Sequence, residues 1–234
     1  MKEKLNLQAV LFDLDGVLID SGADIVASVN AALTHFGYKE EPYEVIIKFV
    51  GNGAKNLLIR SLDYQGINAE AMPNFSEFFD WYVAWYRSHA AEKTVLYTGI
   101  GELLEKLKKE GVFCAVVSNK PLSVTREILK HFSIDSFFDA VVGPEQLSRI
   151  KPDPEGLALA VSFIEKKRNI TIVPKRVLMV GDSATDIQAG RALGAHTCAV
   201  TEGFGNREKL LAENADIVVP FAGELVKILF MPKV

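Results

Sequence analysis

The segment AVLFDLDGVLID, from Ala9 to Asp20, ends an apolar run with two aspartates that are separated by one leucine and followed by a glycine. The run Ala9–Phe12 predicts a β-strand, and Asp13 and Asp15 come directly after it. An ionised carboxylate beside buried aliphatic side chains costs several kcal/mol unless a cation or hydrogen-bond donors compensate. The segment therefore indicates a site for positive charge at the end of a buried strand.

Beyond residue 95 the chain alternates amphipathic helical segments with short β-rich runs, which is typical of a parallel sheet covered by helices. Besides Ala9–Phe12, the predicted strands are Val112–Ser118, Ala140–Val142, Arg176–Val180, His196–Val200 and Asp216–Val219. Near-continuous apolar runs such as FCAVV and VLMV suit strands that are buried on both faces. The predicted fold class is therefore α/β.

Residues from about 20 to 90 predict helices and no strand. Apolar residues recur at helical spacing at Ile25, Val26, Val29, Leu33 and Phe36, and Gly37 is a typical C-cap. Three further helices are predicted over 42–50, 54–64 and 73–89. The last one carries the aromatic residues Phe75, Phe78, Phe79, Tyr82 and Trp85, which we interpret as the core of this helical insert rather than a ligand-binding stripe.

Composition limits the classes of partner. The chain has 234 residues, and its 26 basic and 30 acidic residues give a formal net charge of -4, so no general basic field exists to bind nucleic acid. No apolar window approaches the roughly twenty residues of a membrane span, and the N-terminal MKEKLNLQ lacks the apolar region of a signal peptide. We expect a soluble, cytoplasmic protein that does not bind membranes.

Cys114 and Cys198 have no zinc-site spacing and are interpreted as buried free thiols.

Polar side chains follow the other predicted strands as well. In an open parallel sheet, ligands bind where the carboxyl ends of the strands meet the following loops. Besides Asp13 and Asp15, the residues at these places are Ser118, Asn119, Lys151, Asp182 and Asp186. Clustered carboxylates favour a hard dication, and Mg²⁺ usually takes one or two carboxylates together with waters and a substrate phosphate. The Ser118 hydroxyl, the Asn119 backbone and the Lys151 ammonium group are donors that suit phosphate oxygens.

Each of these residues also has a purely structural interpretation. Asp15-Gly16 is a common turn dipeptide, and Ser118-Asn119 could simply begin a helix. Lys151 could be a solvated loop charge. Asp182 and Ser183 are good N-cap residues for a helix within GDSATDIQAG. These interpretations do not explain why all of the residues follow successive strands in order.

The segments FDLDGVLIDS, VVSNKP, the lysine of IKPDP and GDSATD resemble the four ordered motifs of the haloacid dehalogenase superfamily. The resemblance covers essentially the whole chain, and FVGNGAKNLLIRSL, SNKP and TEGFGNREKL are most similar to the phosphoglycolate phosphatases. It implies a doubly wound parallel core of residues 1–18 and 91–234 with an inserted all-helical cap of residues 19–90. It also implies a Mg²⁺-dependent phosphatase that hydrolyses a small phosphorylated metabolite, with 2-phosphoglycolate the favoured substrate.

The resemblance also assigns roles to the residues that match the motifs. Asp13 resembles the nucleophile that becomes an aspartyl phosphate. Its chemistry agrees with this role, because a carboxylate is ionised at neutral pH and forms an intermediate that is readily hydrolysed. Asp15 resembles the general acid and, afterwards, the general base. Ser118, Asn119 and Lys151 are expected to hold the phosphoryl oxygens.

The implied metal ligands are the Asp13 carboxylate, the Asp15 backbone carbonyl and Asp182, with Asp186 and Ser183 supporting the site from nearby. Metal charge relieves the repulsion between the nucleophile and the phosphate.

The cap is expected to cover this site and to contact the part of the substrate beyond the phosphate. Gly51, Asn52 and Gly53 are the candidate contact, because two glycines expose backbone N–H groups that suit a small carboxylate. The same glycines could instead only end the helix over 42–50. The resemblance favours the contact.

Three rival functions share parts of this pattern. A β-phosphoglucomutase-like phosphotransferase, or another small-metabolite phosphatase of the superfamily, would use Asp13, Asp15 and Lys151. Dehalogenation does not need the second aspartate or Mg²⁺. A receiver-like phospho-accepting signalling module also combines acidic residues, a hydroxyl and a lysine around Mg²⁺, but such modules are much shorter and lack a helical insert. The sequence indicates nothing about the oligomeric state.

Overall fold

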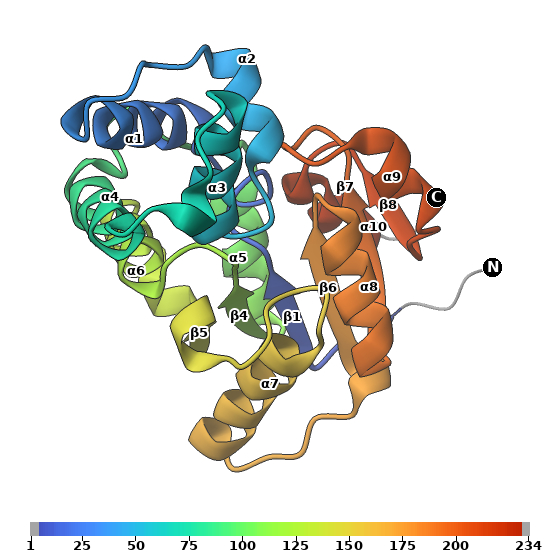
Figure 1. Cartoon of the computed structure of the whole chain (residues 1–234). Helices are drawn as coiled ribbons and strands as arrows, with labels where there is room; N and C mark the ends of the chain where they lie inside the picture. The colour runs from blue at the N-terminus through green and yellow to red at the C-terminus, as the bar shows by residue number, and fades with distance from the viewer. Residues whose placement is uncertain (1–4, 231–234) are drawn as a thin grey trace.

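The structure is a computed structural model and describes residues 5–230, except for the side chain of Glu70. Within this range, six parallel strands form one sheet in the order β5-β4-β1-β6-β7-β8 (Figure 1). Their bounds are β1 Ala9–Phe12, β4 Phe113–Val117, β5 Ala140–Val142, β6 Val177–Gly181, β7 His196–Val200 and β8 Ile217–Val219. All six predicted strands are confirmed, with bounds that differ by at most one residue. The first strand lies near the middle, where Ala9 pairs with Phe113 on one side and Val177 on the other.

Helices cover both faces of the sheet, which confirms the doubly wound α/β class. One face packs against α5 Ile100–Lys109 and α10 Leu225–Phe230, and the other against α7 Glu155–Arg168 and α8 Ala184–Leu193. Alternate residues of β1 pack into the apolar clusters on the two faces of the sheet, because successive side chains of a strand point to opposite faces. The remaining core helices are α6 Leu122–His131 and α9 Arg207–Ala212, and the short 3₁₀ turns are η3 Asp135–Phe137, η4 Pro144–Gln146, η5 Pro174–Arg176 and η6 Ala222–Glu224.

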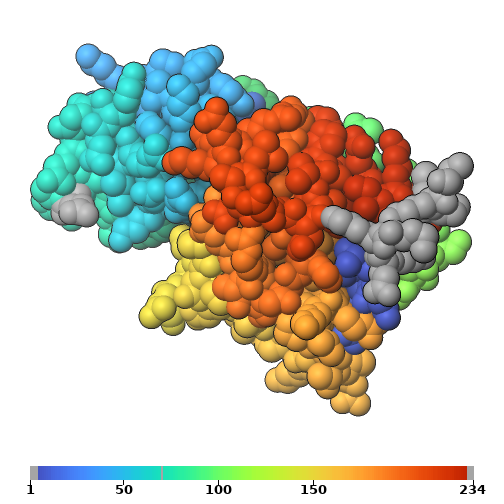
Figure 2. All heavy atoms as spheres, turned by 90° about the vertical axis from the view of Figure 1, so that its right-hand side faces the viewer, coloured from blue at the N-terminus to red at the C-terminus, as the bar shows by residue number. Residues whose placement is uncertain are grey.

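Helices also fill the insert, as predicted. They are α1 Gly22–His35, α2 Tyr43–Ile46 with the 3₁₀ turn η1 Ile47–Phe49, α3 Ala54–Tyr64, the 3₁₀ turn η2 Ala69–Ala71, and α4 Phe75–His89. Gly37 follows α1 with φ +83°, the left-handed conformation that a glycine C-cap adopts. The cap forms a lobe of its own beside the core, in blue to cyan in the space-filling view (Figure 2).

A short antiparallel ribbon joins the cap to the core, and it is absent from the strands predicted from the sequence. It pairs β2 Ile19–Asp20 with β3 Val95–Leu96. Two-residue strands give no periodic pattern, which is why only the six longer strands are predicted. The ribbon brings both cap connections side by side, and Asp24 in α1 reinforces it by accepting hydrogen bonds from the backbone N–H groups of Lys93 and Thr94.

Cap and core share one continuous apolar cluster, which includes Val10 and Phe12 of β1 as well as Leu58, Phe78 and Tyr82 of the cap. Both cysteines are buried free thiols, as predicted. Burial raises the pKa of the Cys114 thiol to about 12, so this thiol is protonated and unreactive at neutral pH. None of the helices within residues 5–230 combines the length and the apolar character of a membrane span.

Candidate active site

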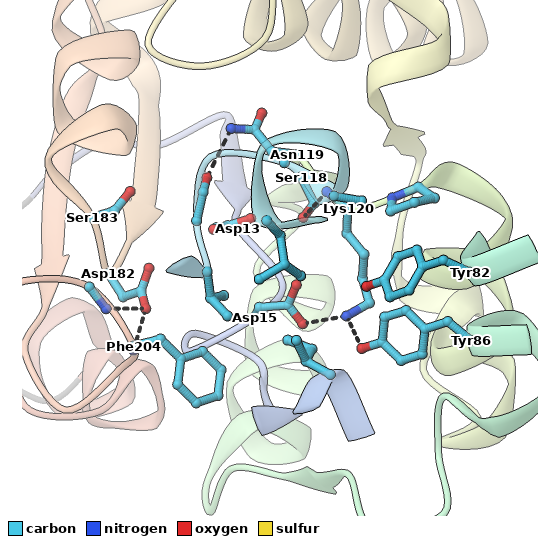
Figure 3. Close-up of a pocket in the computed structure, with 18 residues that line it drawn as sticks. Asp13, Asp15, Tyr82, Tyr86, Ser118, Asn119, Lys120, Asp182, Ser183 and Phe204 are labelled. Carbon is cyan, nitrogen blue, oxygen red and sulfur yellow. Dashed lines mark hydrogen bonds and ion pairs between the residues drawn. The ribbon is translucent and has the colours of Figure 1, made fainter. Parts of the chain in front are cut away.

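A cavity of about 60 Å³ lies between the carboxyl ends of the strands and the cap (Figure 3). Its lining includes six of the polar residues singled out in the sequence, namely Asp13, Asp15, Ser118, Asn119, Asp182 and Ser183. Strands β1, β4 and β6 end at this edge of the sheet and deliver these side chains. The sequence prediction that they meet at one place is therefore confirmed geometrically.

Asp13 and Lys151 form the buried base of the site. Hydrogen bonding of Asp13 N to Val180 O at 2.9 Å extends the β1–β6 pairing by one residue. The Lys151 Nζ lies 2.9 Å from Asp13 Oδ1 and 2.6 Å from Asp186 Oδ1, and it donates to Val117 O at 2.8 Å. The contacts with the two carboxylates are ion pairs, and the Val117 carbonyl oxygen accepts the hydrogen bond of the ammonium group. Lys151 is thus a buried, paired cation, and its interpretation as a solvated loop charge is wrong.

Burial dominates the electrostatics of this base. It raises the pKa of Asp13 to about 6; Lys151 opposes this shift, while the negative charges of Asp186 and Asp15 add to it. Burial alone would lower the pKa of Lys151, but the attraction of Asp13 and Asp186 outweighs it, so the pKa is raised and the ammonium stays charged.

Asp182 is held by the loop that follows β7. Its Oδ2 accepts hydrogen bonds from the backbone N–H groups of Phe204 at 2.6 Å and Gly205 at 3.1 Å. A Cβ atom at Gly16 would lie 2.0 Å from the same oxygen, so only glycine leaves room for the carboxylate there. Burial, followed by the negative charges of Asp186 and Asp13, raises the pKa of Asp182 well above its usual range.

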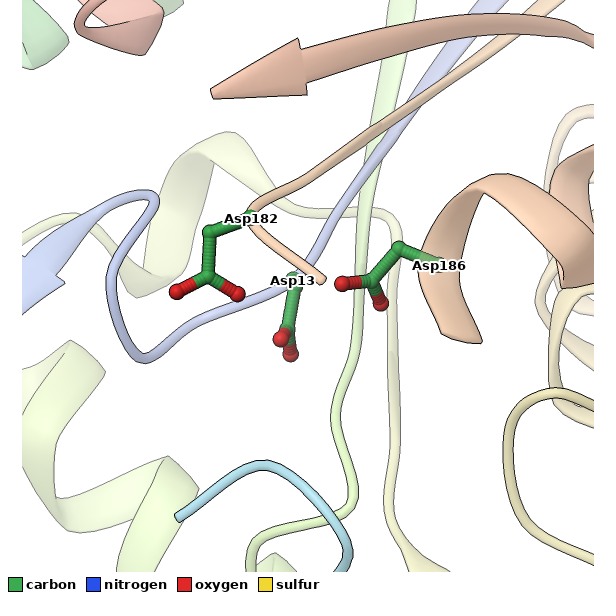
Figure 4. A group of neighbouring side chains, drawn as sticks. All are labelled: Asp13, Asp182 and Asp186. Atoms are coloured by element: carbon green, nitrogen blue, oxygen red, sulfur yellow. The ribbon is translucent and has the colours of Figure 1, made fainter. Parts of the chain in front are cut away.

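The three carboxylates Asp13, Asp182 and Asp186 each present an oxygen within 4.8 Å of the others (Figure 4). Asp186 is already engaged, because Lys151 contacts one of its oxygens and the N–H and hydroxyl of Ser183 donate to the other. This capping box begins α8 with Ser183 as the N-cap, which agrees with its interpretation as a capping residue, whereas Asp182 precedes the cap. Asp13 and Asp182 remain to face a cation. Crowded, buried carboxylates with raised pKa values fit a hard dication, since its charge offsets their repulsion.

Asp15 has a different set of partners from Asp13. Its Oδ1 accepts a hydrogen bond from the Ser21 hydroxyl at 2.5 Å and forms an ion pair with Lys120 Nζ at 2.8 Å. The Lys120 ammonium also donates to the Tyr86 hydroxyl of α4. Lys120 and Tyr86 also line the cavity, and the sequence reasoning missed both of them. Lys120 stands in the quoted motif VVSNKP, so its position beside Ser118 and Asn119 was the available signal.

Ser118 and Asn119 connect the core to the cap loop. The Ser118 hydroxyl oxygen accepts from Lys120 N at 3.2 Å, which leaves its hydrogen free to donate into the cavity. Asn119 Nδ2 donates to the carbonyl oxygen of Gly51 at 3.1 Å. Gly51 and Gly53 line the cavity, whereas Asn52 is exposed outside the lining. Of the three predicted cap-loop residues, the structure therefore brings only the two glycines to the site.

The aromatic residues of α4 divide between packing and the site. Phe78 is buried in the cluster shared by cap and core, which agrees with its interpretation as core. Tyr82 is equally buried but also lines the cavity, together with Tyr86 and with Phe204 from the loop after β7. The interpretation of the aromatic stripe as core alone is thus incomplete at Tyr82, because packing and cavity lining coincide where a helix faces a closed site.

The chain is similar to known proteins over most of its length. Residues 10–200 match the family model described as haloacid dehalogenase-like hydrolase. A phosphoglycolate phosphatase from Haemophilus influenzae is 34% identical over 224 residues, which cover 93% of this chain and 96% of that protein. An N-acetylmuramic acid 6-phosphate phosphatase from Pseudomonas aeruginosa is 33% identical over 228 residues, covering 97% of this chain and 96% of the relative.

Solved structures agree with these relatives. The crystal structure of a predicted phosphoglycolate phosphatase from Haemophilus somnus superimposes with a TM-score of 0.84 at 30% sequence identity. The match covers 95% of this chain and 98% of that one. A sheet that brings the four motifs to one edge, a helical cap, and these near full-length similarities establish that the chain belongs to the haloacid dehalogenase-like hydrolase family.

Proposed function

We propose that the protein is a Mg²⁺-dependent phosphatase that hydrolyses a small phosphomonoester, with 2-phosphoglycolate the favoured substrate. One observation carries the proposal: Asp13, Asp15 and Asp182 converge on one cavity, where a second carboxylate and a lysine flank the first aspartate. The names of the relatives from Haemophilus influenzae and Haemophilus somnus support the substrate. The cytoplasmic location expected from the sequence stays a prediction.

In the proposed reaction, a carboxylate oxygen of Asp13 attacks phosphorus in line, and the bond between phosphorus and the ester oxygen breaks. Asp15 gives its proton to the departing oxygen, which leaves as an alcohol. Water then attacks the aspartyl phosphate and transfers a proton to Asp15, so inorganic phosphate leaves and both aspartates return to their first state. The Ser118 hydroxyl and the backbone of Asn119 donate to the equatorial oxygens, where the charge of the transition state resides.

Mg²⁺ would be held by the Asp13 carboxylate, the Asp15 backbone carbonyl and Asp182, with Asp186 and Ser183 fixing the surroundings. When bound, it supplies positive charge against the phosphoryl oxygens. Lys151 contributes to the same end, because its ammonium contacts Asp13 and limits the repulsion between nucleophile and substrate. We further propose that residues 1–18 and 91–234 form the catalytic core and residues 19–90 the cap, of which 1–4 and 231–234 lie outside the described residues.

A panel of phosphomonoesters tests the proposal, with phosphate release measured with and without Mg²⁺. We expect Mg²⁺-dependent hydrolysis of 2-phosphoglycolate and p-nitrophenyl phosphate. N-acetylmuramic acid 6-phosphate belongs in the panel as a second candidate substrate, because a relative of similar identity carries that name. Transfer of the phosphate within a sugar phosphate, without release, would instead favour the phosphotransferase. Stable phosphorylation without turnover would favour the signalling module, and no reaction with any compound would refute the proposal.

A further inference from the structure

Lys120 is a buried cation that the proposed reaction does not use. Its side chain is 3% exposed and lies in the cavity wall, beside Asp15 on one side and Tyr86 on the other (Figure 3). The ammonium lies 4.4 Å from the centre of the Tyr86 ring, in addition to its hydrogen bond with the hydroxyl. Two of its three N–H bonds thus have partners, and no third acceptor is found for it among residues 5–230. One donor of a desolvated cation therefore remains available to a ligand.

The position of Lys120 is defined by the group it contacts. Asp15 is the proposed proton donor to the ester oxygen, so Lys120 Nζ, 2.8 Å from Asp15 Oδ1, lies on the side of the leaving group rather than of the phosphoryl group. Lys151 serves the opposite side, where it contacts Asp13. In 2-phosphoglycolate the carboxylate carbon is two bonds from the ester oxygen, roughly 2.5 Å away. A carboxylate at that separation comes within reach of the free donor when Asp15 contacts the ester oxygen.

The surroundings of Lys120 favour an anionic partner. Apolar and aromatic side chains form part of the cavity lining, with Ile25, Leu57 and Tyr82 among them, and Tyr82 lies beside Tyr86 and Lys120 in Figure 3. A cation in such surroundings binds an anion more strongly than one in water, because few water molecules compete. The small cavity also favours a compact leaving group, since a large one requires the cap to move away.

We infer that Lys120, oriented by Tyr86, determines specificity for leaving groups that carry a carboxylate one carbon from the ester oxygen, as in 2-phospho-carboxylates. The inference rests on the proposed phosphatase function. Lys120 acts as a binding residue for the leaving group, and Tyr86 acts as a positioning residue that holds the ammonium in the wall.

The test compares 2-phosphoglycolate with its neutral amide, 2-phosphoglycolamide, which has nearly the same size. We expect the unmodified enzyme to prefer the carboxylate. Lys120→Met should lower kcat/KM for 2-phosphoglycolate by about 10- to 100-fold more than for the amide, as expected when a charge-assisted hydrogen bond is lost. Tyr86→Phe should reduce the same preference by a smaller factor, because the charge remains but is held less firmly. Lys55→Met, at an exposed lysine near the start of α3, is the matched control and should leave the preference unchanged.

Equal losses on the two substrates for a Lys120→Met variant with a normal circular dichroism spectrum would overturn the inference and leave the phosphatase proposal intact. If the unmodified enzyme hydrolyses no phosphomonoester, the proposed function fails, and binding becomes the test. Calorimetry on Asp13→Asn should then still show tighter binding of 2-phosphoglycolate than of the amide, and should show that the difference disappears when Lys120→Met is added. Equal affinity for both compounds in Asp13→Asn would refute the inference.

Discussion

Asp13 and Asp15, the two aspartates that follow β1, each form an ion pair with a different lysine. Lys151 contacts Asp13 from below the cavity, and Lys120 contacts Asp15 from its wall. Both ammonium groups are buried, so neither pair is weakened much by solvent screening, and each aspartate keeps a fixed orientation. The two carboxylates can therefore lie two residues apart without adopting the same role.

The role of Asp13 is tested by its nearly isosteric amide. Asp13→Asn should abolish turnover, with a loss greater than about a hundredfold, because an amide cannot form the acyl phosphate. Asp15→Asn should permit some phosphorylation but slow the release of phosphate. Steady-state rates and trapping of the phosphorylated protein distinguish the two, and circular dichroism controls for folding. An Asp13→Asn enzyme that keeps more than about a hundredth of the activity would contradict the assignment.

The raised pKa of Asp13 predicts how pH affects stability and Mg²⁺ binding. Without metal, native Asp13 keeps its proton up to about pH 6, whereas the unfolded chain releases it near 4. The native state binds more protons in this window, so the free energy of unfolding of the metal-free protein should fall as pH rises through it. Metal binding needs ionised carboxylates, so Mg²⁺ should raise Tm more at about pH 7.5 than at about pH 5.

Melting curves with and without millimolar Mg²⁺ at the two pH values measure this difference. Asp182→Asn is the control, and its Tm should respond little to Mg²⁺ at either pH. The prediction is wrong if the Mg²⁺ increment of the unmodified protein is the same at both pH values.

Among the elements, α1 is linked to the segment before β3 by hydrogen bonds to the Asp24 carboxylate. Asp24 is buried and accepts hydrogen bonds from three donors: Lys93 N at 3.0 Å, Thr94 N at 2.8 Å and the Thr94 hydroxyl at 2.7 Å. Asp24→Ala should lower the free energy of unfolding by about 2–4 kcal/mol, since it leaves buried donors without an acceptor. Urea unfolding measures the loss. Asp80→Ala, on the exposed face of α4, should change stability by less than about 0.5 kcal/mol.

The loop before α3 is tested at Gly53, which has φ +84°. A Cβ there would make ordinary contacts, at 3.5 Å from Asn119 O and from the Ile150 side chain, so the cost of Gly53→Val lies mainly in the backbone conformation. We expect it to lower kcat/KM for 2-phosphoglycolate and to spare p-nitrophenyl phosphate. Lys151→Ala should instead reduce both by similar, large factors, because the phosphoryl side is common to all substrates. Equal losses for folded Gly53→Val would return this loop to a structural role.

Much of this arrangement could be predicted from the sequence. Each strand is a separate apolar run, and the residue at its carboxyl end must lie at the edge of the sheet where ligands bind. Asp13, Ser118 and Asp182 were found in that way. Lys120 was missed because the direction of a lysine in a loop depends on its partner, here Tyr86, which belongs to another element. The N–H groups of Phe204 and Gly205 that hold Asp182 were missed because backbone donors leave no side-chain signal.

On the scale of the whole molecule, the apolar cluster that runs through cap and core predicts one cooperative unfolding transition. Both tryptophans, Trp81 and Trp85, lie in α4, so tryptophan fluorescence reports on the cap alone, whereas far-ultraviolet circular dichroism reports on all helices and strands. The two signals should change at the same urea concentration. A fluorescence transition at distinctly lower urea would show that the cap unfolds separately.

The central position of β1 has a consequence for synthesis on the ribosome. This strand is made first, yet its neighbours β4 and β6 begin only at residues 113 and 177. Until β4 is made, the apolar run AVLF therefore has no strand to pair with, while the helices of the insert emerge beside it; from then until β6 is made, only one of its two edges is paired. Nascent chains that stop before residue 177 carry an unpaired strand edge, so stalled or truncated products, rather than the finished protein, are the aggregation-prone species and the natural clients of chaperones.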